Sequence, residues 1–315
     1  VARAIHAGVD MDMVGEDYLQ ELPVLARDGL DAPDAGFART AGQITGLIDR
    51  ACRRVLTFKQ RLGLLANPFR GMEGGLAPSR QAGRQLARKS AAQSAVLLKN
   101  DDLLPLSTGT RVALIGPFGA DRANMLGTWA VSGRAEDVVP LDQAIAEVTG
   151  CAPMLAWGSN IVDQPWLEQR LNVHGVTVTR DPRDEAELLA EAVATALSAD
   201  VIVAAIGEAK EHAGESSSVL SVRIPAPQRR LIDALAAMGK PLVVVVFAGR
   251  PLALGRIAEQ ADALLYAWHG GIAGPEGIAD LLFGKAAPSG RLAVTLPAHP
   301  GQVPLSHSGD PTGRP

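Results

Sequence analysis

The feature that most constrains the fold is the apolar run VIVAAI at residues 201–206, which ends abruptly in a polar loop at 207–218. A run of this length is typical of a strand buried on both faces, as in a parallel sheet covered by helices. In such sheets, ligands bind beside the loops that leave the carboxyl ends of the strands. Gly207 and Gly214 are expected to let this loop bend sharply. The loop carries three carboxylates, Glu208, Glu211 and Glu215. It is therefore a candidate for acid–base chemistry, and the competing interpretation is a solvated loop whose charges face water.

From residue 111 onward, apolar runs alternate with segments of helical periodicity. Strands separated by helices imply a mainly parallel sheet with helices on both faces. The predicted fold class is α/β, a three-layer α/β/α sandwich. The expected strands are residues 112–115, 201–206, 242–247, 263–268 and 291–296. The expected helices are residues 141–148, 188–197, 227–237 and 276–283.

The first part of the chain has a different pattern. A short strand is expected at residues 7–13, followed by helices at 18–28 and 44–62. A strand and two helices cannot form a core on their own. We therefore expect this part to belong to a larger barrel or sheet whose other strands lie upstream, so that the chain is a fragment. A segment rich in Gly and Pro then leads to a helix at 81–93.

Composition excludes several classes of protein. The chain has 315 residues, of which 47% are hydrophobic and 20% charged, which is enough for a sizeable core. Its net charge of −4 and its scattered Lys and Arg argue against a nucleic-acid-binding protein. No apolar run reaches the length of roughly 18 residues that crosses a bilayer. Cys52 and Cys151 lack the spacing of a zinc site or a disulfide scaffold and are expected to be buried packing residues.

The motifs narrow the chemistry further. Neither GxGxxG nor GxxxxGK[ST] follows any expected strand, so no nucleotide cofactor is expected. No GxSxG elbow is present, which argues against serine hydrolysis. His212 lies near the three glutamates, but no second histidine occurs at a helical spacing from it, so no metal is expected.

An ordered series of short motifs, spread over nearly the whole chain, resembles glycoside hydrolase family 3. The segments AGVDMDM (7–13), IDRACRRVL (48–56) and KQRLGL (59–64) resemble the end of that family's catalytic barrel. The following motifs resemble its second domain: SAVLLKN (94–100), LPL (104–106), ALIGP (113–117), GTW (127–129), GKPL (239–242), GRPL (249–252), DLLFG (280–284), PSGRL (288–292), QVP (302–304) and TGRP (312–315).

The resemblance implies a domain organisation. Residues 1–66 would be the last strand and helices of an incomplete (β/α)8 barrel, 67–80 a linker, 81–297 the α/β/α domain, and 298–315 a linker to a further domain. The parent would be a retaining, exo-acting β-glucosidase of the periplasmic bacterial type, which needs no cofactor. It would act on oligosaccharides or aryl β-glucosides, in the periplasm or outside the cell. Its oligomeric state stays open, with a homodimer as one option.

The resemblance also implies roles for particular residues. Glu215, in the context HAGESS, matches the position of the family's acid/base, whereas the nucleophilic aspartate lies in a Ser-Asp-Trp or Ser-Asp-His context that this chain lacks. Asp10 and Asp12 follow that strand in the family and are not candidates for the nucleophile. Trp129 matches a tryptophan that stacks on the leaving sugar, and its other interpretation is a core tryptophan. Asp12 and His212 are expected to bind substrate.

Three segments depart from the family pattern. VLS at 219–221 replaces Arg-Ser/Thr-Asp, GIAGP at 271–275 replaces Gly-Thr-Glu-Gly-Gly, and SH at 306–307 replaces two tyrosines. These changes affect the loops that hold the sugar. They keep an alternative open, a non-catalytic carbohydrate-binding or scaffolding module with the same fold.

Overall fold

The computed structural model describes residues 1–31, 36–38, 40–72, 80–215 and 217–309. The chain divides into two compact units, 1–77 and 78–315, each of which is described by itself. Residues 73–79 of the expected linker at 67–80, residue 216 of the carboxylate-rich loop and the TGRP motif at 312–315 lie outside the described residues.

The first unit is helical. Its helices pack around small apolar clusters that include Ile5, Leu22 and Leu47. The longest helix begins with a capping box, in which Thr40 Oγ1 accepts from the backbone N–H of Gln43 and Gln43 Oε1 accepts from that of Thr40. The helices are α1 (Ala2–Ala7), α2 (Asp17–Asp28) and α3 (Ala41–Arg61).

The strand expected at residues 7–13 does not form, and that prediction is wrong. After α1, residues 8–13 have irregular backbone, held by the Tyr18 hydroxyl, which donates to the carbonyl oxygen of Val9 at 2.9 Å. A strand needs a neighbour for its backbone N–H and C=O groups, and no other strand lies among the described residues of this unit. The local sequence can favour a strand, but only a partner strand can provide hydrogen bonds for its backbone N–H and C=O groups.

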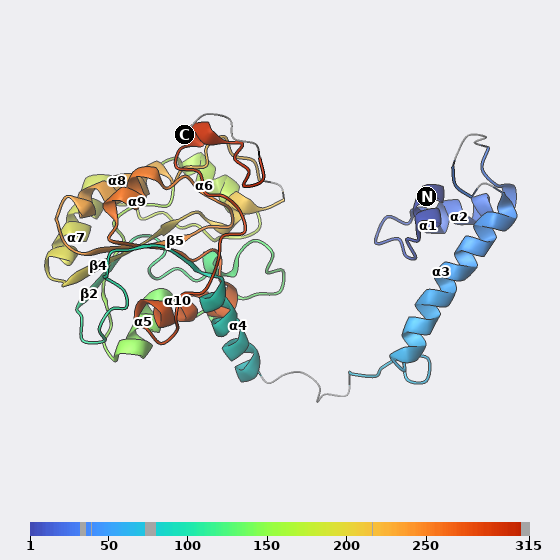
Figure 1. Ribbon diagram of the computed structural model, residues 1–315, viewed down its shortest axis with the longest axis horizontal. Helices are drawn as coiled ribbons and strands as arrows, with labels where there is room; N and C mark the ends of the chain where they lie inside the picture. Colours follow the sequence, from blue (N-terminus) through green and yellow to red (C-terminus); the bar gives the residue numbers. More distant parts are fainter. Residues whose placement is uncertain (32–35, 39, 73–79, 216, 310–315) are drawn as a thin grey trace. The chain divides into compact units, whose positions relative to one another are not determined.

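The second unit is built on a six-stranded sheet in the order β1-β6-β5-β4-β2-β3 (Figure 1). All neighbouring strands are parallel except β1, which pairs antiparallel with β6. Every residue of β4 and β5 is buried, which explains why their sequences are continuous apolar runs. The strands are β1 (Val96–Asn100), β2 (Val112–Ile115), β3 (Met154–Ala156), β4 (Val201–Gly207), β5 (Leu242–Phe247) and β6 (Ala263–Tyr266).

Helices cover both faces of this sheet, as Figure 1 shows. One apolar cluster packs α5 and α10 against one face, and a second packs α7, α8 and α9 against the other, so the unit is the predicted α/β/α sandwich. The α-helices are α4 (Arg80–Ser94), α5 (Leu141–Thr149), α6 (Pro165–Leu171), α7 (Glu185–Leu197), α8 (Ala226–Ala236), α9 (Gly255–Gln260) and α10 (Gly274–Leu282). The 3-10 turns are η1 (Asn124–Leu126), η2 (Ala135–Asp137), η3 (Lys210–Ala213), η4 (Gly271–Ala273) and η5 (Pro300–Gln302).

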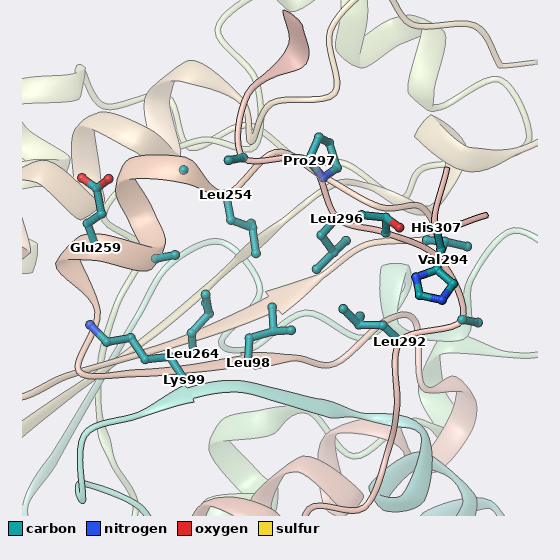
Figure 2. Close-up of a pocket in the computed structure, with 15 residues that line it drawn as sticks. Leu98, Lys99, Leu254, Glu259, Leu264, Leu292, Val294, Leu296, Pro297 and His307 are labelled. Carbon is teal, nitrogen blue, oxygen red and sulfur yellow. The ribbon is translucent and has the colours of Figure 1, made fainter. Parts of the chain in front are cut away.

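The strand expected at residues 291–296 is also absent from the sheet. The edge position beside β6 is taken by β1, whose half-buried sequence was not assigned as a strand. Residues 292–296 instead line an apolar cavity of about 610 Å³ beside β1, β6 and α9. Figure 2 shows Leu292 and Leu296 on the opposite side of this cavity from Leu98 and Leu264, with Val294 beside His307. Of the three apolar side chains, Leu296 packs against the core of the sheet, whereas Leu292 and Val294 are exposed.

Two smaller findings complete the fold. Both cysteines are exposed, contrary to the expectation that they pack in a core. Among the described helices, none combines the length and apolar character needed to cross a membrane.

Candidate active site

The candidate site lies at the carboxyl edge of the parallel strands. The loop after β4, residues 207–218, carries the three glutamates and is called the carboxylate loop below. It is flanked by the loop after β2, residues 116–140, and by the short loops after β5 and β6. Their first residues bring charged and aromatic groups together at one edge of the sheet, as predicted for a ligand site in this fold.

A buried ion pair joins the loops after β4 and β5. Glu208 is 2% exposed, and Arg250 reaches its carboxylate with two hydrogen bonds, 2.8 Å from Nε to Oε2 and 2.5 Å from Nη2 to Oε1. The end of β6 and the loop after it also contact this pair. The Tyr266 hydroxyl, at the end of β6, donates to the Arg250 carbonyl oxygen at 2.5 Å, and His269 Nε2, in the loop, lies 3.2 Å from the Glu208 carbonyl oxygen. Because both carboxylate oxygens of Glu208 bind the guanidinium, this glutamate holds the loops together and is not available as an acid.

Gly207 begins the carboxylate loop in a conformation that only glycine adopts readily. Its φ is +149°, and a Cβ built there would lie 1.7 Å from the carbonyl oxygen of Phe247. The predicted need for glycine is therefore met at this position. Gly214 differs, because its φ of −73° is open to any residue. The sharp bend comes from the first glycine alone.

The loop after β2 fixes the base of the carboxylate loop. Asn124 is fully buried and accepts from the backbone N–H of Lys210 at 3.0 Å, while its Nδ2 donates to Asp121 and to the Thr177 carbonyl oxygen. Thr128 Oγ1 donates to the Lys210 carbonyl oxygen. Burial raises the pKa of Asp121 to about 6, against the opposing hydrogen bonds from Asn124. The start of η3 is thus held by an amide whose hydrogen bonds are all made inside the protein.

Glu215 lies beyond this anchored region and is exposed. The other remaining glutamate of the loop, Glu211, is only 11% exposed at its side chain, and its carboxylate faces His174 Nδ1 at 3.5 Å and Lys210 Nζ at 3.9 Å. The Glu211 carbonyl oxygen also accepts from Ser217 Oγ. Of the three carboxylates, Glu215 is the one with no ion-pair partner among the described residues, and it is the one free to approach a ligand.

Trp129 lies on one side of the carboxylate loop, 67% exposed, at a cavity of about 460 Å³. This cavity is also lined by Ala213 of the carboxylate loop, by Gly249 and by Trp268. Trp268 has a φ of +56°, which is rare for a bulky residue, and its ring packs 4.6 Å from that of Tyr266 between centroids. The exposure of Trp129 favours a binding role over the core interpretation.

His212 and Asp12 have local structural contacts. The His212 ring is 7% exposed, its Nδ1 lies 3.3 Å from the Ala209 carbonyl oxygen, and burial lowers its pKa. It is therefore neutral at pH 7, and it borders two cavities that Trp129 does not line. Asp12, in the first unit, accepts from the backbone N–H of Tyr18 at 3.2 Å, close to the start of α2. The structure thus places His212 and Glu215 on one loop with Trp129 beside it, and Asp12 in the other unit.

No group of three or more His, Cys, Asp or Glu side chains within the described ranges has the arrangement of a metal site. The chemistry available at this edge is that of an exposed carboxyl group beside aromatic surfaces.

Comparison with known proteins agrees with this geometry. The Glycosyl hydrolase family 3 C-terminal domain matches residues 95–314. The chain belongs to glycoside hydrolase family 3. Its family membership accounts for the mainly parallel sheet and for the series of short motifs along the sequence.

The relatives of this family 3 chain are β-glucosidases and β-xylosidases. A periplasmic β-glucosidase of Salmonella typhimurium is 37% identical over 99% of this chain and 40% of its own length. A putative β-xylosidase of Formosa agariphila is 30% identical over 96% of the chain and 36% of its own length. A β-glucosidase of Listeria innocua, solved with isofagomine, is 30% identical with a TM-score of 0.80, over 100% of this chain and 40% of that one. The chain thus spans about 40% or less of the length of these relatives.

Residue-level reasoning from the sequence missed the Glu208–Arg250 pair and the role of Trp268 at the cavity. Both had a weak signal, since each residue comes within three residues of the carboxyl end of a buried strand. Arg250 is far from Glu208 in sequence, and the Trp268 cavity is lined by residues of other loops, so only the sheet order brings these groups together.

Proposed function

We propose that this chain is part of a retaining, exo-acting β-glucosidase that removes terminal β-linked sugars. In this proposal, residues 1–66 belong to the catalytic barrel, 67–80 form a linker, 81–297 form the second domain and 298–315 lead to a further domain. The family and the activities printed for its relatives support the reaction class, and the solved Listeria innocua β-glucosidase complexes with glucose and with laminaribiose support a glucoside substrate.

Retaining glycosidases use two carboxyl groups, about 5–5.5 Å apart, one as nucleophile and one as general acid and then base. In the proposed mechanism, Glu215 protonates the leaving oxygen and then activates water. The nucleophilic aspartate is supplied by a barrel strand that is not part of this sequence. The chain alone is therefore expected to be inactive, and no metal or cofactor takes part.

The observation that carries this assignment is the contrast among the three glutamates of the carboxylate loop. Glu208 is bound by Arg250, and the Glu211 carboxylate faces the His174 imidazole and the Lys210 ammonium group. Glu215 is exposed at the end of a loop whose base is anchored. A general acid must move its proton to a substrate atom, so a carboxyl group held in an internal ion pair is poorly suited to that role.

The test is hydrolysis of aryl β-glucosides by the full-length parent, compared with Glu215→Ala. Removing the acid is expected to slow substrates with poor leaving groups by roughly 10²–10⁴-fold and activated aryl glucosides much less. Azide is expected to rescue the variant and give a β-glucosyl azide. Glu259→Ala, which removes an exposed glutamate from α9, is the matched control and should behave as wild type.

Wild-type rates in Glu215→Ala would move the acid to another residue, with Glu211 as the next candidate. An inert wild type that still binds glucosides would favour the non-catalytic binding module.

The cellular location is part of the same proposal. We propose that the protein is periplasmic or secreted, because it resembles the periplasmic β-glucosidase of Salmonella typhimurium.

A further inference from the structure

The short helix α6 presents a tryptophan to solvent next to the carboxylate loop. Trp166 is 63% exposed, although it lies in an ordered helix at the edge of the core. Val173 and Val219, which line the same cavity, are also exposed. An exposed aromatic residue that gathers with other exposed apolar side chains at one cavity, and does not stand alone on the surface, indicates a binding surface.

The helix is held rigidly from its inner side. Glu168 forms a 2.6 Å ion pair with Arg180, and Leu171 is buried in the core. The turn after the helix is closed by Asn172, whose Oδ1 accepts from the backbone N–H groups of residues 177 and 178 at 2.8 Å. The exposed indole is therefore carried by an anchored helix and not by a loose loop.

A buried glutamine connects this segment directly to the start of the carboxylate loop. Gln228 is fully buried, its Oε1 accepts from the Gly207 N–H at 2.7 Å, and its Nε2 donates to the carbonyl oxygens of Gly207 and Ile161 at 2.8 and 2.9 Å. Ile161 precedes α6 by only a few residues. The position of Trp166 is thus coupled to that of the loop that carries Glu215.

Trp166 borders two cavities that the carboxylate loop helps to line, and Trp129 lines neither of them. One, of about 370 Å³, is lined by Arg170 and His174 and by Glu211, Ser217 and Ser218 of the loop. The other, of about 450 Å³, extends past His212 toward Arg229. Residues that flank Glu215 in sequence, Glu211 and His212 before it and Ser217 after it, line the first cavity together with Trp166, so this polar surface is formed in part by the loop that carries Glu215.

We infer that Trp166 and this surface bind the leaving portion of an oligosaccharide, at the sugar rings beyond the glycosidic oxygen that Glu215 protonates. The inference rests on the proposed function. The indole face would stack on the apolar C–H face of a pyranose ring, while the nearby hydroxyl, guanidinium and carboxylate groups bind its hydroxyls. The site would favour substrates of three or more sugars over disaccharides and aryl glucosides.

The experiment compares Trp166→Ala with wild type in the full-length parent, using 4-nitrophenyl β-glucoside, laminaribiose and laminaritriose. We expect kcat/KM for laminaritriose to fall about fivefold, with the aryl glucoside changed less than about twofold. Trp166→Phe keeps an aromatic face and should recover most of the loss. Leu197→Ala, an exposed apolar residue at the end of α7, is the control.

A second readout is calorimetric binding of laminaritriose to Glu215→Gln with and without Trp166→Ala. Weaker binding by the double variant supports the site even if the wild type hydrolyses nothing, in which case only the proposed function fails. Equal trisaccharide kinetics and equal binding overturn the inference and leave the proposed function standing. An equal loss on the aryl glucoside and the trisaccharide also overturns it, because the tryptophan would then act only through the loop. A change in self-association with unchanged sugar binding overturns it in favour of a protein contact.

Discussion

Replacing Arg250 by alanine tests whether the buried ion pair holds the carboxyl edge together. The Glu208 carboxylate is 3% exposed and takes both of its hydrogen bonds from this guanidinium. Removing one partner of a buried pair leaves an uncompensated charge and typically costs about 3–5 kcal/mol. Because the Arg250 side chain is 18% exposed and water can partly replace it, we expect the lower end, about 3 kcal/mol.

The double variant Glu208→Leu/Arg250→Met separates charge burial from loss of packing. With no charge left to desolvate, it should lie within about 1 kcal/mol of wild type. The hydrogen bonds of Tyr266 and His269 go to backbone carbonyl oxygens of the pair and are retained. The stability loss of Arg250→Ala should therefore be largely recovered when the carboxylate is removed as well.

The assay is thermal or urea unfolding followed by tryptophan fluorescence. All four tryptophans lie between residues 129 and 268, so the signal reports on the second unit alone. A loss of about 3 kcal/mol should lower its Tm by roughly 6–12 °C. Arg256→Ala is the control, because its pair with Asp233 is exposed and should contribute less than about 1 kcal/mol. If Arg250→Ala unfolds no more easily than Arg256→Ala, the ion pair does not have the structural role assigned to it.

Two further predictions concern the same edge. Gly207→Ala should prevent folding of the second unit, because its Cβ would overlap the Phe247 carbonyl oxygen. Gly214→Ala should cost far less, about 1 kcal/mol, because its φ is ordinary and its Cβ would press only on the Thr128 methyl group, 3.1 Å away. Soluble yield and Tm decide this, and equal behaviour of the two variants would contradict it. Asp121 has a folded-state pKa of about 6 against 3.8 unfolded, so its contribution is full below pH 3.8 and is lost as pH rises through about 6. The unfolding free energy of wild type relative to Asp121→Asn should therefore fall by up to about 3 kcal/mol between pH 4 and pH 7, and a pH-independent difference would refute the burial argument.

The sequence predicted the second unit well because its signals are local. The apolar runs of β2, β4 and β5 indicate strands that are buried on both faces, and Gly207 indicates a backbone conformation that other residues avoid. The position of the candidate site follows from the same pattern, since the carboxylate loop leaves a buried strand. The resemblance to the family then directed attention to Glu215 and Trp129.

The wrong strand predictions share one cause. Residues 7–13 and 291–296 have compositions that suit a strand, but a strand is stable only beside another strand. In the first case the described part of that unit offers no neighbour, and in the second β1 occupies the edge of the sheet. The half-buried strand β1 itself has too weak an alternation to be recognised from sequence.

From its sequence alone, the protein's fold class, the order of most helices and strands and the loop that carries its carboxylates could be determined. Only the tertiary structure decided which carboxylate is free. Glu208 is paired with Arg250 from the loop after the neighbouring strand β5, Glu211 faces His174 from the segment after α6, and Glu215 is exposed. The physical reason is that hydrophobic periodicity is encoded within a few residues, whereas the pairing of charges depends on contacts between segments that are tens of residues apart.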